Sequence, residues 1–266
     1  MLLAIDIGNT NVTMGVFREE ELLATWRLAT DTRKMPDEYA LLIRSLLPLK
    51  GVASQDIDSI ALCSVVPPLT QAFEEMSRVY FGIDPLVVGT GIRTGVRILY
   101  DNPRDVGADR VVDAVAAYQL YGGPVIVVDF GTATVFDAVS REGDYLGGAI
   151  ALGINLSAEV LFERTSQLRR IEMASPKVAI GRNTPASIQS GIIFGHVGMV
   201  EAMVRRFKAE LGEDARVVAT GGLAPLIFKE TPIFDAVNLD LTLVGLRLIY
   251  EINARAKATQ AGEEHA

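Results

Sequence analysis

The sequence predicts an α/β fold built from two related halves, with strands and helices alternating along the chain. Three observations predict this fold: an internal repeat, short apolar runs between turn residues, and helical patterns in the gaps. In the repeat, LAIDIGNTNVTMGVF at residues 3–17 resembles IVVDFGTATVFDAVS at residues 126–140. The alignment places Asp6 on Asp129, so we expect two copies of one structural unit.

The first half reads as three strands, a helix, a fourth strand and two further helices. Its strands are apolar runs bounded by Gly, Asn and Asp. Pro36, followed by two acidic residues, favours a helix N-terminus. The expected strands lie within residues 3–17, 21–30 and 59–69, and the expected helices are 36–47, 69–81 and 106–121.

The second half repeats the strand pattern and then adds a long helix. Residues 144–153 match residues 21–30 at the same offset as the first repeat. A weaker match relates RVVATGGLAPL at residues 216–226 to SIALCSVVPPL at residues 59–69. The remaining expected elements are helices at 186–211 and 242–256.

A turn-rich link, Tyr121-Gly-Gly-Pro124, precedes the second copy and marks the expected domain boundary. The predicted division is an N-terminal domain at 1–121, a C-terminal domain at 122–256 and a flexible polar tail at 257–266. Two similar domains would enclose a cleft, which is a common place for a ligand.

Composition limits the partners that we expect. The formal net charge is −8 and the isoelectric point is near 4.9, so neither nucleic acid nor an anionic membrane surface is an expected partner. The single cysteine, Cys63, excludes an internal disulfide. Because Asp6 comes too early for a signal peptide and no apolar run is long enough to span a membrane, we expect a cytoplasmic protein.

Two Asp-x-Gly turns carry the clearest chemical pattern. Asp6-Ile-Gly8-Asn-Thr-Asn11 and Asp129-Phe-Gly131-Thr-Ala-Thr134 each follow an apolar run, which places each Asp at the exposed end of a strand. Glycine lets the backbone approach a bulky anion, and the following amides and hydroxyls can bind phosphate oxygens. A carboxylate beside phosphates needs a cation such as Mg²⁺ between them. Either turn alone reads better as an ordinary hairpin, but the recurrence at equivalent positions favours a nucleotide site.

Other candidate residues keep two interpretations on spacing alone. The loop Thr220-Gly221-Gly222 is either a place for an adenine or ribose to lie or a plain strand-to-helix turn. Asp109 and Arg110 read first as charges at the start of a helix, and Tyr100 reads first as a core or rim aromatic.

Together these features resemble the actin, hexokinase and Hsp70 superfamily, which has duplicated ribonuclease-H-like domains. Within it, the chain resembles the type III pantothenate kinases from about Leu2 to Tyr250. The specific motif is Gly107-Ala-Asp-Arg110, which follows Tyr100-Asp-Asn-Pro103. Further matching segments are Ser64–Pro68, Gly147-Gly148 and Gly181–Thr184.

The resemblance implies ATP-dependent phosphorylation of pantothenate to 4′-phosphopantothenate, the first step of coenzyme A biosynthesis. It assigns Asp109 as the base that takes the hydroxyl proton and Asp129 as a metal ligand for a monovalent cation, K⁺ or NH₄⁺, beside Mg²⁺ bound with ATP. Thr184 would reach the pantothenate site of a neighbouring subunit, which implies a homodimer. The residues assigned to ATP are Asp6, Gly8, Asn9, Thr10, Asn11, Thr13, Thr132, Gly221 and Gly222. Those assigned to pantothenate are Tyr100, Gly107, Ala108, Asp109, Arg110 and Thr184.

The chain departs from the family pattern at three places. Leu152 stands where the family usually has Pro, Asp113 where it has Asn, and Leu168-Arg169-Arg170 where it has Leu-Pro. Two alternatives remain: a sugar or acetate kinase of the same superfamily, and a non-catalytic relative that acts as a transcriptional accessory protein. The aspartates at both turns and in the Gly-Ala-Asp-Arg motif favour the pantothenate kinase. We expect His196 and Cys63 to be structural.

Overall fold

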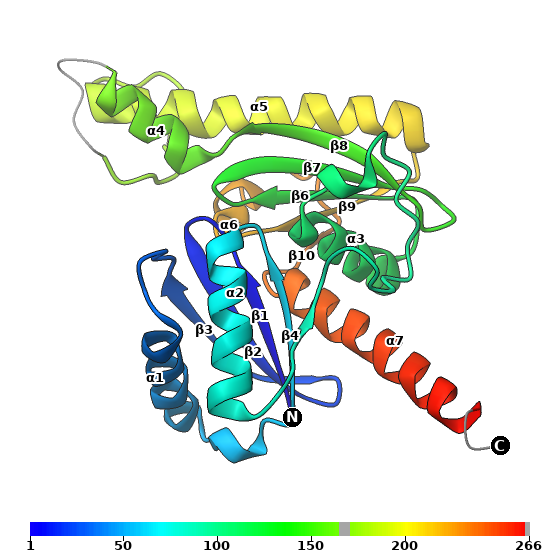
Figure 1. Cartoon of the computed structure of the whole chain (residues 1–266). Helices are drawn as coiled ribbons and strands as arrows, with labels where there is room; N and C mark the ends of the chain where they lie inside the picture. Colours follow the sequence, from blue (N-terminus) through cyan, green and yellow to red (C-terminus); the bar gives the residue numbers. More distant parts are fainter. Residues whose placement is uncertain (165–170, 264–266) are drawn as a thin grey trace. The chain divides into compact units, whose positions relative to one another are not determined.

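The computed structural model describes residues 1–164 and 171–263. The chain divides into two compact units, each with its own five-stranded sheet (Figure 1). The first unit contains Met1–Gly95, Asn102–Ala116 and Thr242–Ala266, and the second unit contains Val96–Asp101 and Ala117–Leu241.

The sheet of the first unit has the strand order β3-β2-β1-β4-β5. The central strand β1 is antiparallel to β2 and parallel to β4, so the end of β1 lies between two neighbours. The strands are β1 (Leu2–Ile7), β2 (Asn11–Arg18), β3 (Glu21–Ala29), β4 (Ser59–Ser64) and β5 (Leu86–Val87).

Helices cover this sheet because its central strands carry continuous runs of buried apolar residues. Leu3 and Ile5 of β1 join a buried cluster with Tyr39 of α1 and Phe73 of α2, whose ring centroids are 4.6 Å apart. A β-carbon on Gly15 would lie 2.9 Å from the Leu243 side chain, so a glycine in β2 lets α7 approach closely. The helices that begin or lie in this unit are α1 (Pro36–Leu46), α2 (Pro67–Met76), α3 (Ala108–Tyr121) and α7 (Leu241–Glu263), with the short turns η1 (Leu47–Lys50), η2 (Ser54–Asp56), η3 (Ser77–Phe81) and η4 (Pro103–Asp105).

The sheet of the second unit repeats this topology, with the order β10-β9-β6-β7-β8. Its central strand β6 is antiparallel to β7 and parallel to β9, as β1 is to β2 and β4. The strands are β6 (Val125–Phe130), β7 (Ala133–Val139), β8 (Tyr145–Leu152), β9 (Arg216–Thr220) and β10 (Ala236–Val237). The two matching sheets confirm the predicted α/β class and the internal repeat.

The long helix α5 runs along the sheet of the second unit (Figure 1). Ile193 and Val200 of α5 are buried in one cluster with Ile126 and Val128 of β6. The helices of this unit are α4 (Ile154–Glu163), α5 (Thr184–Leu211) and α6 (Ala224–Phe228). Within the described residues, no helix combines the length and the apolar character that a membrane span requires.

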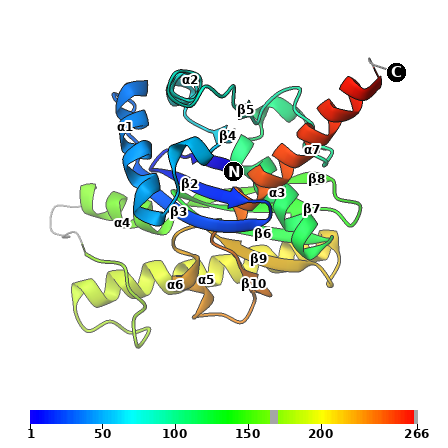
Figure 2. The same ribbon diagram turned by 90° about the horizontal axis from the view of Figure 1, so that it is seen from below.

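The compact units differ from the predicted domain division in three respects. The division between units falls inside α3, after Ala116, α7 belongs with the first unit, and Val96–Asp101 belongs with the second. Packing explains the second difference, because Thr242 donates a hydrogen bond to Asp113 at 2.7 Å, and a β-carbon on Gly245 would overlap the Val112 carbonyl oxygen. The helix also continues to Glu263, through residues expected as a tail, as Figure 2 shows. Alanine, lysine and glutamine in that stretch are good helix formers.

Candidate functional site

The first Asp-x-Gly turn connects β1 to β2 in the first unit. The Gly8 amide donates to the Asn11 carbonyl at 3.0 Å, and the Thr30 hydroxyl donates to the Gly8 carbonyl at 2.6 Å. These bonds fix the turn while Asn9, Thr10 and Asn11 stay exposed. Thr13 faces Asp6 across the β1–β2 ladder. The exposed residues of this turn carry amide and hydroxyl groups, the kinds of group that bind anions.

Asp6, the last residue but one of β1, lies in an environment that disfavours the charge of its carboxylate. Burial and the nearby Asp109 carboxylate raise the pKa of Asp6 to about 7, although a hydrogen bond from Cys63 opposes this shift. The Cys63 thiol donates to Asp6 Oδ1 at 3.4 Å from the adjacent strand β4. Two carboxyl groups that repel each other suit a divalent cation, because a bound positive charge would relieve the repulsion.

Asp109 is the second residue of α3, and its carboxylate folds back onto the backbone at the start of that helix. Burial raises the pKa of Asp109, and the adjacent Arg110, through its backbone N–H and its charge, partly offsets this. Asp109 Oδ1 accepts a hydrogen bond from the Arg110 amide at 2.8 Å. A β-carbon on Gly107 would crowd that same oxygen, so glycine is needed for this side-chain position. The structure thus brings Asp6, Gly107 and Asp109 together, with Ala108 and Arg110 half-buried beside them.

The second Asp-x-Gly turn connects β6 to β7 in the second unit. Asp129 is the last residue but one of β6 and faces Val135 of β7 and Thr220 of β9. A β-carbon on Gly221, whose φ is +86°, would overlap Asp129 Oδ1. The third loop, which Gly222 continues, therefore packs directly on the second turn, and only a residue without a side chain fits there.

A further glycine supports this turn, and the sequence motifs did not single it out. A β-carbon on Gly153, at the start of α4, would overlap the carbonyl oxygen of Thr132. Thr132 itself is exposed. Gly153 and Gly221 thus close on the second turn from two elements distant in sequence, which a local motif cannot reveal.

Tyr100 lies in the short segment of the second unit that precedes the Gly-Ala-Asp-Arg motif. Its side chain is 38% exposed, and a β-carbon on Gly147 would lie 3.2 Å from its ring. The ring of buried Tyr145 is 6.4 Å away, centroid to centroid. The Gly147-Gly148 match therefore marks the surface against which Tyr100 rests.

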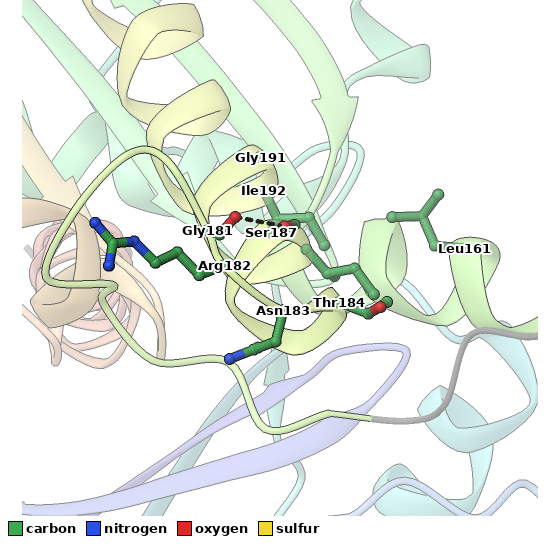
Figure 3. Close-up of a pocket in the computed structure, with 9 residues that line it drawn as sticks. Leu161, Gly181, Arg182, Asn183, Thr184, Ser187, Gly191 and Ile192 are labelled. Carbon is green, nitrogen blue, oxygen red and sulfur yellow. Dashed lines mark hydrogen bonds between the residues drawn. The ribbon is translucent and has the colours of Figure 1, made fainter.

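Thr184 opens α5 beside a pocket of about 770 Å³ (Figure 3). Asn183 caps the helix by accepting a hydrogen bond from the Ala186 amide at 2.9 Å, and the Ser187 hydroxyl donates to the Gly181 carbonyl at 3.4 Å. Figure 3 shows that α5 contributes most of the lining and that Leu161 comes from α4. The pocket is lined by Leu161, Gly181, Arg182, Asn183, Thr184, Ser187, Ile188, Gly191 and Ile192.

Comparison with known proteins identifies the family. A model of the type III pantothenate kinase family matches residues 2–206. A type III pantothenate kinase from Dehalococcoides mccartyi strain BAV1 is 54% identical over 252 residues, which is 95% of this chain and 96% of that protein. This chain belongs to the type III pantothenate kinase family. A type III pantothenate kinase from Moorella thermoacetica is 52% identical and is covered over its whole length.

Solved structures of distant proteins share the fold of this pantothenate kinase family member. A structure from Campylobacter jejuni, described as a Baf family transcriptional activator, has a TM-score of 0.61 at 18% identity and covers 95% of this chain and 99% of its own. A 2-dehydro-3-deoxygalactonokinase structure from Sinorhizobium meliloti has a TM-score of 0.57 at 12% identity and covers 96% of each chain. At these identities the likeness concerns the fold alone.

Two of the three departures from the pantothenate kinase pattern have a place in the structure. Asp113 is buried in α3 and accepts the hydrogen bond from Thr242. Leu152 ends β8, and its carbonyl oxygen lies 3.0 Å from His196 Nε2, while His196 Nδ1 lies 2.8 Å from the Ile192 carbonyl oxygen. His196 thus joins α5 to β8, in line with the structural role expected of it. Leu168-Arg169-Arg170 lies outside the described residues.

Proposed function

We propose that this chain transfers the γ-phosphoryl group of ATP to the primary hydroxyl of pantothenate, producing 4′-phosphopantothenate in the first step of coenzyme A biosynthesis. The observation that carries this proposal is the 54% identity to a type III pantothenate kinase over 95% of the chain. The proposal is supported by the presence of Asp6, Asp109 and Asp129 at the positions of the family motifs.

ATP is assigned to the Asp-x-Gly turns and the third loop. Asn9, Thr10 and Asn11, which are exposed in the first turn, would bind phosphate oxygens, with Gly8 shaping the turn and Thr13 beside it. Asp6 would position Mg²⁺ bound to the phosphates, and the cation would neutralise charge that builds up during transfer. Thr132 would contact ATP, and the small loop at Gly221 and Gly222 would accept the adenosine.

Pantothenate is assigned to the start of α3 and to Tyr100. Asp109 would accept the proton of the attacking hydroxyl, and its raised pKa brings its basicity closer to neutral pH. Arg110 would hold the pantothenate carboxylate, since a guanidinium binds a carboxylate through two hydrogen bonds. Gly107 and Ala108 would leave room for the substrate backbone, and Tyr100 would line the pocket.

Asp129 is assigned to a monovalent cation, K⁺ or NH₄⁺. A β-carbon on Gly131 would lie 3.2 Å from Asp129 Oδ2, and one on Gly221 would overlap Asp129 Oδ1, so glycine at both positions leaves room beside this carboxylate. A bound cation there would offset the negative charge of the phosphates. The rate should be higher in K⁺ than in Na⁺ buffer free of K⁺ and ammonium, and equal rates would remove this assignment.

The active form is assigned as a cytoplasmic homodimer, in which Thr184 completes the pantothenate site of the neighbouring subunit. Exposed apolar side chains on one part of the second unit support an interface: Ile150 and Leu152 of β8, Val160 and Leu161 of α4, and Val178 and Ile180 before α5. The net charge of −8 supports the absence of nucleic acid and anionic membranes among the partners.

One assay tests the main proposal. Purified protein with ATP, Mg²⁺, K⁺ and pantothenate should release ADP and form 4′-phosphopantothenate. A coupled assay measures the ADP, and mass spectrometry identifies the phosphopantothenate. Glucose and acetate in place of pantothenate should give no turnover above background. Absence of phosphopantothenate from folded, dimeric protein would contradict the proposal, and turnover of glucose or acetate instead would support the alternative kinases.

A further inference from the structure

Residues 96–101, here called the strap, form an added edge on β8. The Leu99 amide donates to the Tyr145 carbonyl at 2.8 Å, and the Tyr145 amide donates to the Arg97 carbonyl at 2.8 Å. Ile98 pairs with Tyr145 in the parallel direction. The strap belongs to the second unit although the residues before and after it belong to the first. Its position therefore depends on what holds it against β8.

A two-point ion pair fastens the strap. Arg97 donates from Nε to Asp144 Oδ1 at 2.7 Å and from Nη2 to Oδ2 at 2.6 Å. These hydrogen bonds lower the pKa of Asp144, whose side chain is 10% exposed. Asp144 is itself held in the turn between β7 and β8, because its amide donates to the Ser140 hydroxyl at 3.1 Å. A forked arginine–carboxylate pair restricts geometry more than a single contact does.

Tyr100, near the end of the strap, packs against Gly147 of β8. Its ring lies over Gly147, whose φ of +119° and close approach both favour glycine. Beside it, Tyr145 is fully buried and donates its hydroxyl proton to Asp137 Oδ1 at 2.8 Å. Burial and this hydrogen bond therefore fix the side chain of Tyr145. The position of the Tyr100 ring is then determined by its contact with Gly147 and by the backbone of the strap.

We propose that the Arg97–Asp144 ion pair is a positioning element for pantothenate binding, which acts by holding the strap so that Tyr100 forms a fixed wall of the pantothenate pocket. This inference rests on the proposed function, in which Tyr100 lines that pocket. Arg97 and Asp144 are positioning residues, since neither is assigned a contact with substrate. Besides the pair, the backbone hydrogen bonds at Leu99 and Tyr145 hold the strap against β8.

The test compares Arg97→Ala with Arg141→Ala. Arg141 belongs to the same β7–β8 turn and pairs with Asp214 at 2.7 Å, so it controls for loss of a surface ion pair near Asp144. Because the Arg97 side chain is 74% exposed, we expect Arg97→Ala to raise KM for pantothenate by about twofold to fivefold, the range of ion pairs near solvent, with KM for ATP unchanged. Arg141→Ala should leave both constants unchanged. Hydrogen exchange at the Leu99 amide should speed up in Arg97→Ala only.

A double-mutant cycle with Tyr100→Ala separates positioning from general stability. If the ion pair acts through Tyr100, adding Arg97→Ala to Tyr100→Ala should change KM for pantothenate little further. Equal effects of Arg97→Ala with and without Tyr100, or an unchanged KM despite faster exchange at Leu99, would overturn the inference. Wild-type protein that phosphorylates no pantothenate would instead overturn the proposed function, and the inference with it, while the exchange result would still report on the strap.

Discussion

At the scale of single residues, the first unit holds two carboxyl groups whose ionisation is opposed by their surroundings. Burial is the largest cause of the raised pKa at both Asp6 and Asp109, and Asp109 adds a repulsive charge at Asp6. The two groups then differ in their partners: Cys63 donates to Asp6, whereas the Arg110 amide donates to Asp109. Cys63, expected to be structural, thus also contacts a candidate site residue.

Asp109→Asn tests the assignment of the base. The amide keeps the size and the oxygen acceptor but cannot take a proton, so turnover should fall by about 10²–10⁴-fold while the affinity for ATP changes little. Steady-state kinetics and titration calorimetry with a non-hydrolysable ATP analogue measure the two effects. Asp105→Asn, at an exposed carboxylate just before α3, is the matched control and should behave as wild type. Normal turnover in Asp109→Asn would exclude the role.

The raised pKa of Asp6 predicts a pH dependence of stability. Its value in the folded protein is about 7, against about 3.9 in an unfolded chain, so the folded state binds the extra proton. Proton binding by Asp6 stabilises the folded state fully at a pH below the pKa of the unfolded chain. This stabilisation is lost as the pH rises through the pKa of the folded protein. The melting temperature of nucleotide-free and metal-free protein should therefore fall relative to that of Asp6→Asn between pH 5 and pH 8 in scanning fluorimetry. A difference between the two proteins that is constant with pH would contradict this.

At the scale of elements, the two sheets use one topology to present two turns. Each turn joins a central strand to its antiparallel neighbour, and each Asp lies near the end of a strand that also has a parallel neighbour. The second turn is then confined by glycines of other elements, Gly153 at the start of α4 and Gly221 after β9. Its shape therefore depends on packing between elements as well as on its own residues.

Gly153→Ala tests this dependence. A methyl group there would overlap the Thr132 carbonyl, so the junction of β8 and α4 must move away from the turn. We expect unfolding free energy to fall by about 1–3 kcal/mol, as in other overpacked sites, and ATP affinity to weaken. Urea unfolding and calorimetry measure both. The control is Gly89→Ala, since a β-carbon at Gly89 meets nothing within 4 Å. Equal behaviour of the two variants would show that the close approach has no consequence.

At the scale of the whole molecule, exposed apolar side chains gather on the second unit. Ile150 is 65% exposed on β8, and Ile180 is 83% exposed before α5. Several exposed large apolar side chains on β8, on α4 and just before α5 are typical of a surface that another protein chain covers. This supports the homodimer in which Thr184 serves the neighbouring subunit.

Ile150→Asp tests the dimer. Wild type should have twice the 28.7 kDa chain mass in light scattering, and a charge at Ile150 should shift it towards the monomer because a buried unpaired carboxylate is costly. Loss of the partner should also lower pantothenate turnover. Leu49→Asp, at a residue 75% exposed in the first unit, should remain dimeric. A wild-type monomer, or an unaltered dimer in Ile150→Asp, would argue against this interface.

Much of the fold and the motifs could be predicted because their signals are local. Apolar runs that end in Asp-x-Gly turns predict the strands that carry Asp6 and Asp129, and the repeat predicts that both have one topology. The helix predicted at 69–81 is α2, which ends at Met76 and passes into η3, and α7 continues to Glu263. The ends of the other predicted helices agree to within two residues, whereas α4 and α6 were not predicted. The strap was not predicted, because nothing near Arg97 in the sequence points to Asp144.

The sequence by itself determined the α/β class, the duplicated strand order and the identity of the chemical motifs, since these depend on residue periodicity and on conformations that glycine permits. Only the tertiary structure decided which distant residues meet: Cys63 with Asp6, Gly221 with Asp129, Gly153 with Thr132, and Gly147 with Tyr100. It also assigned α7 to the first unit. The physical reason is that such contacts arise from packing of whole elements, in which close approach depends on the shapes of both partners.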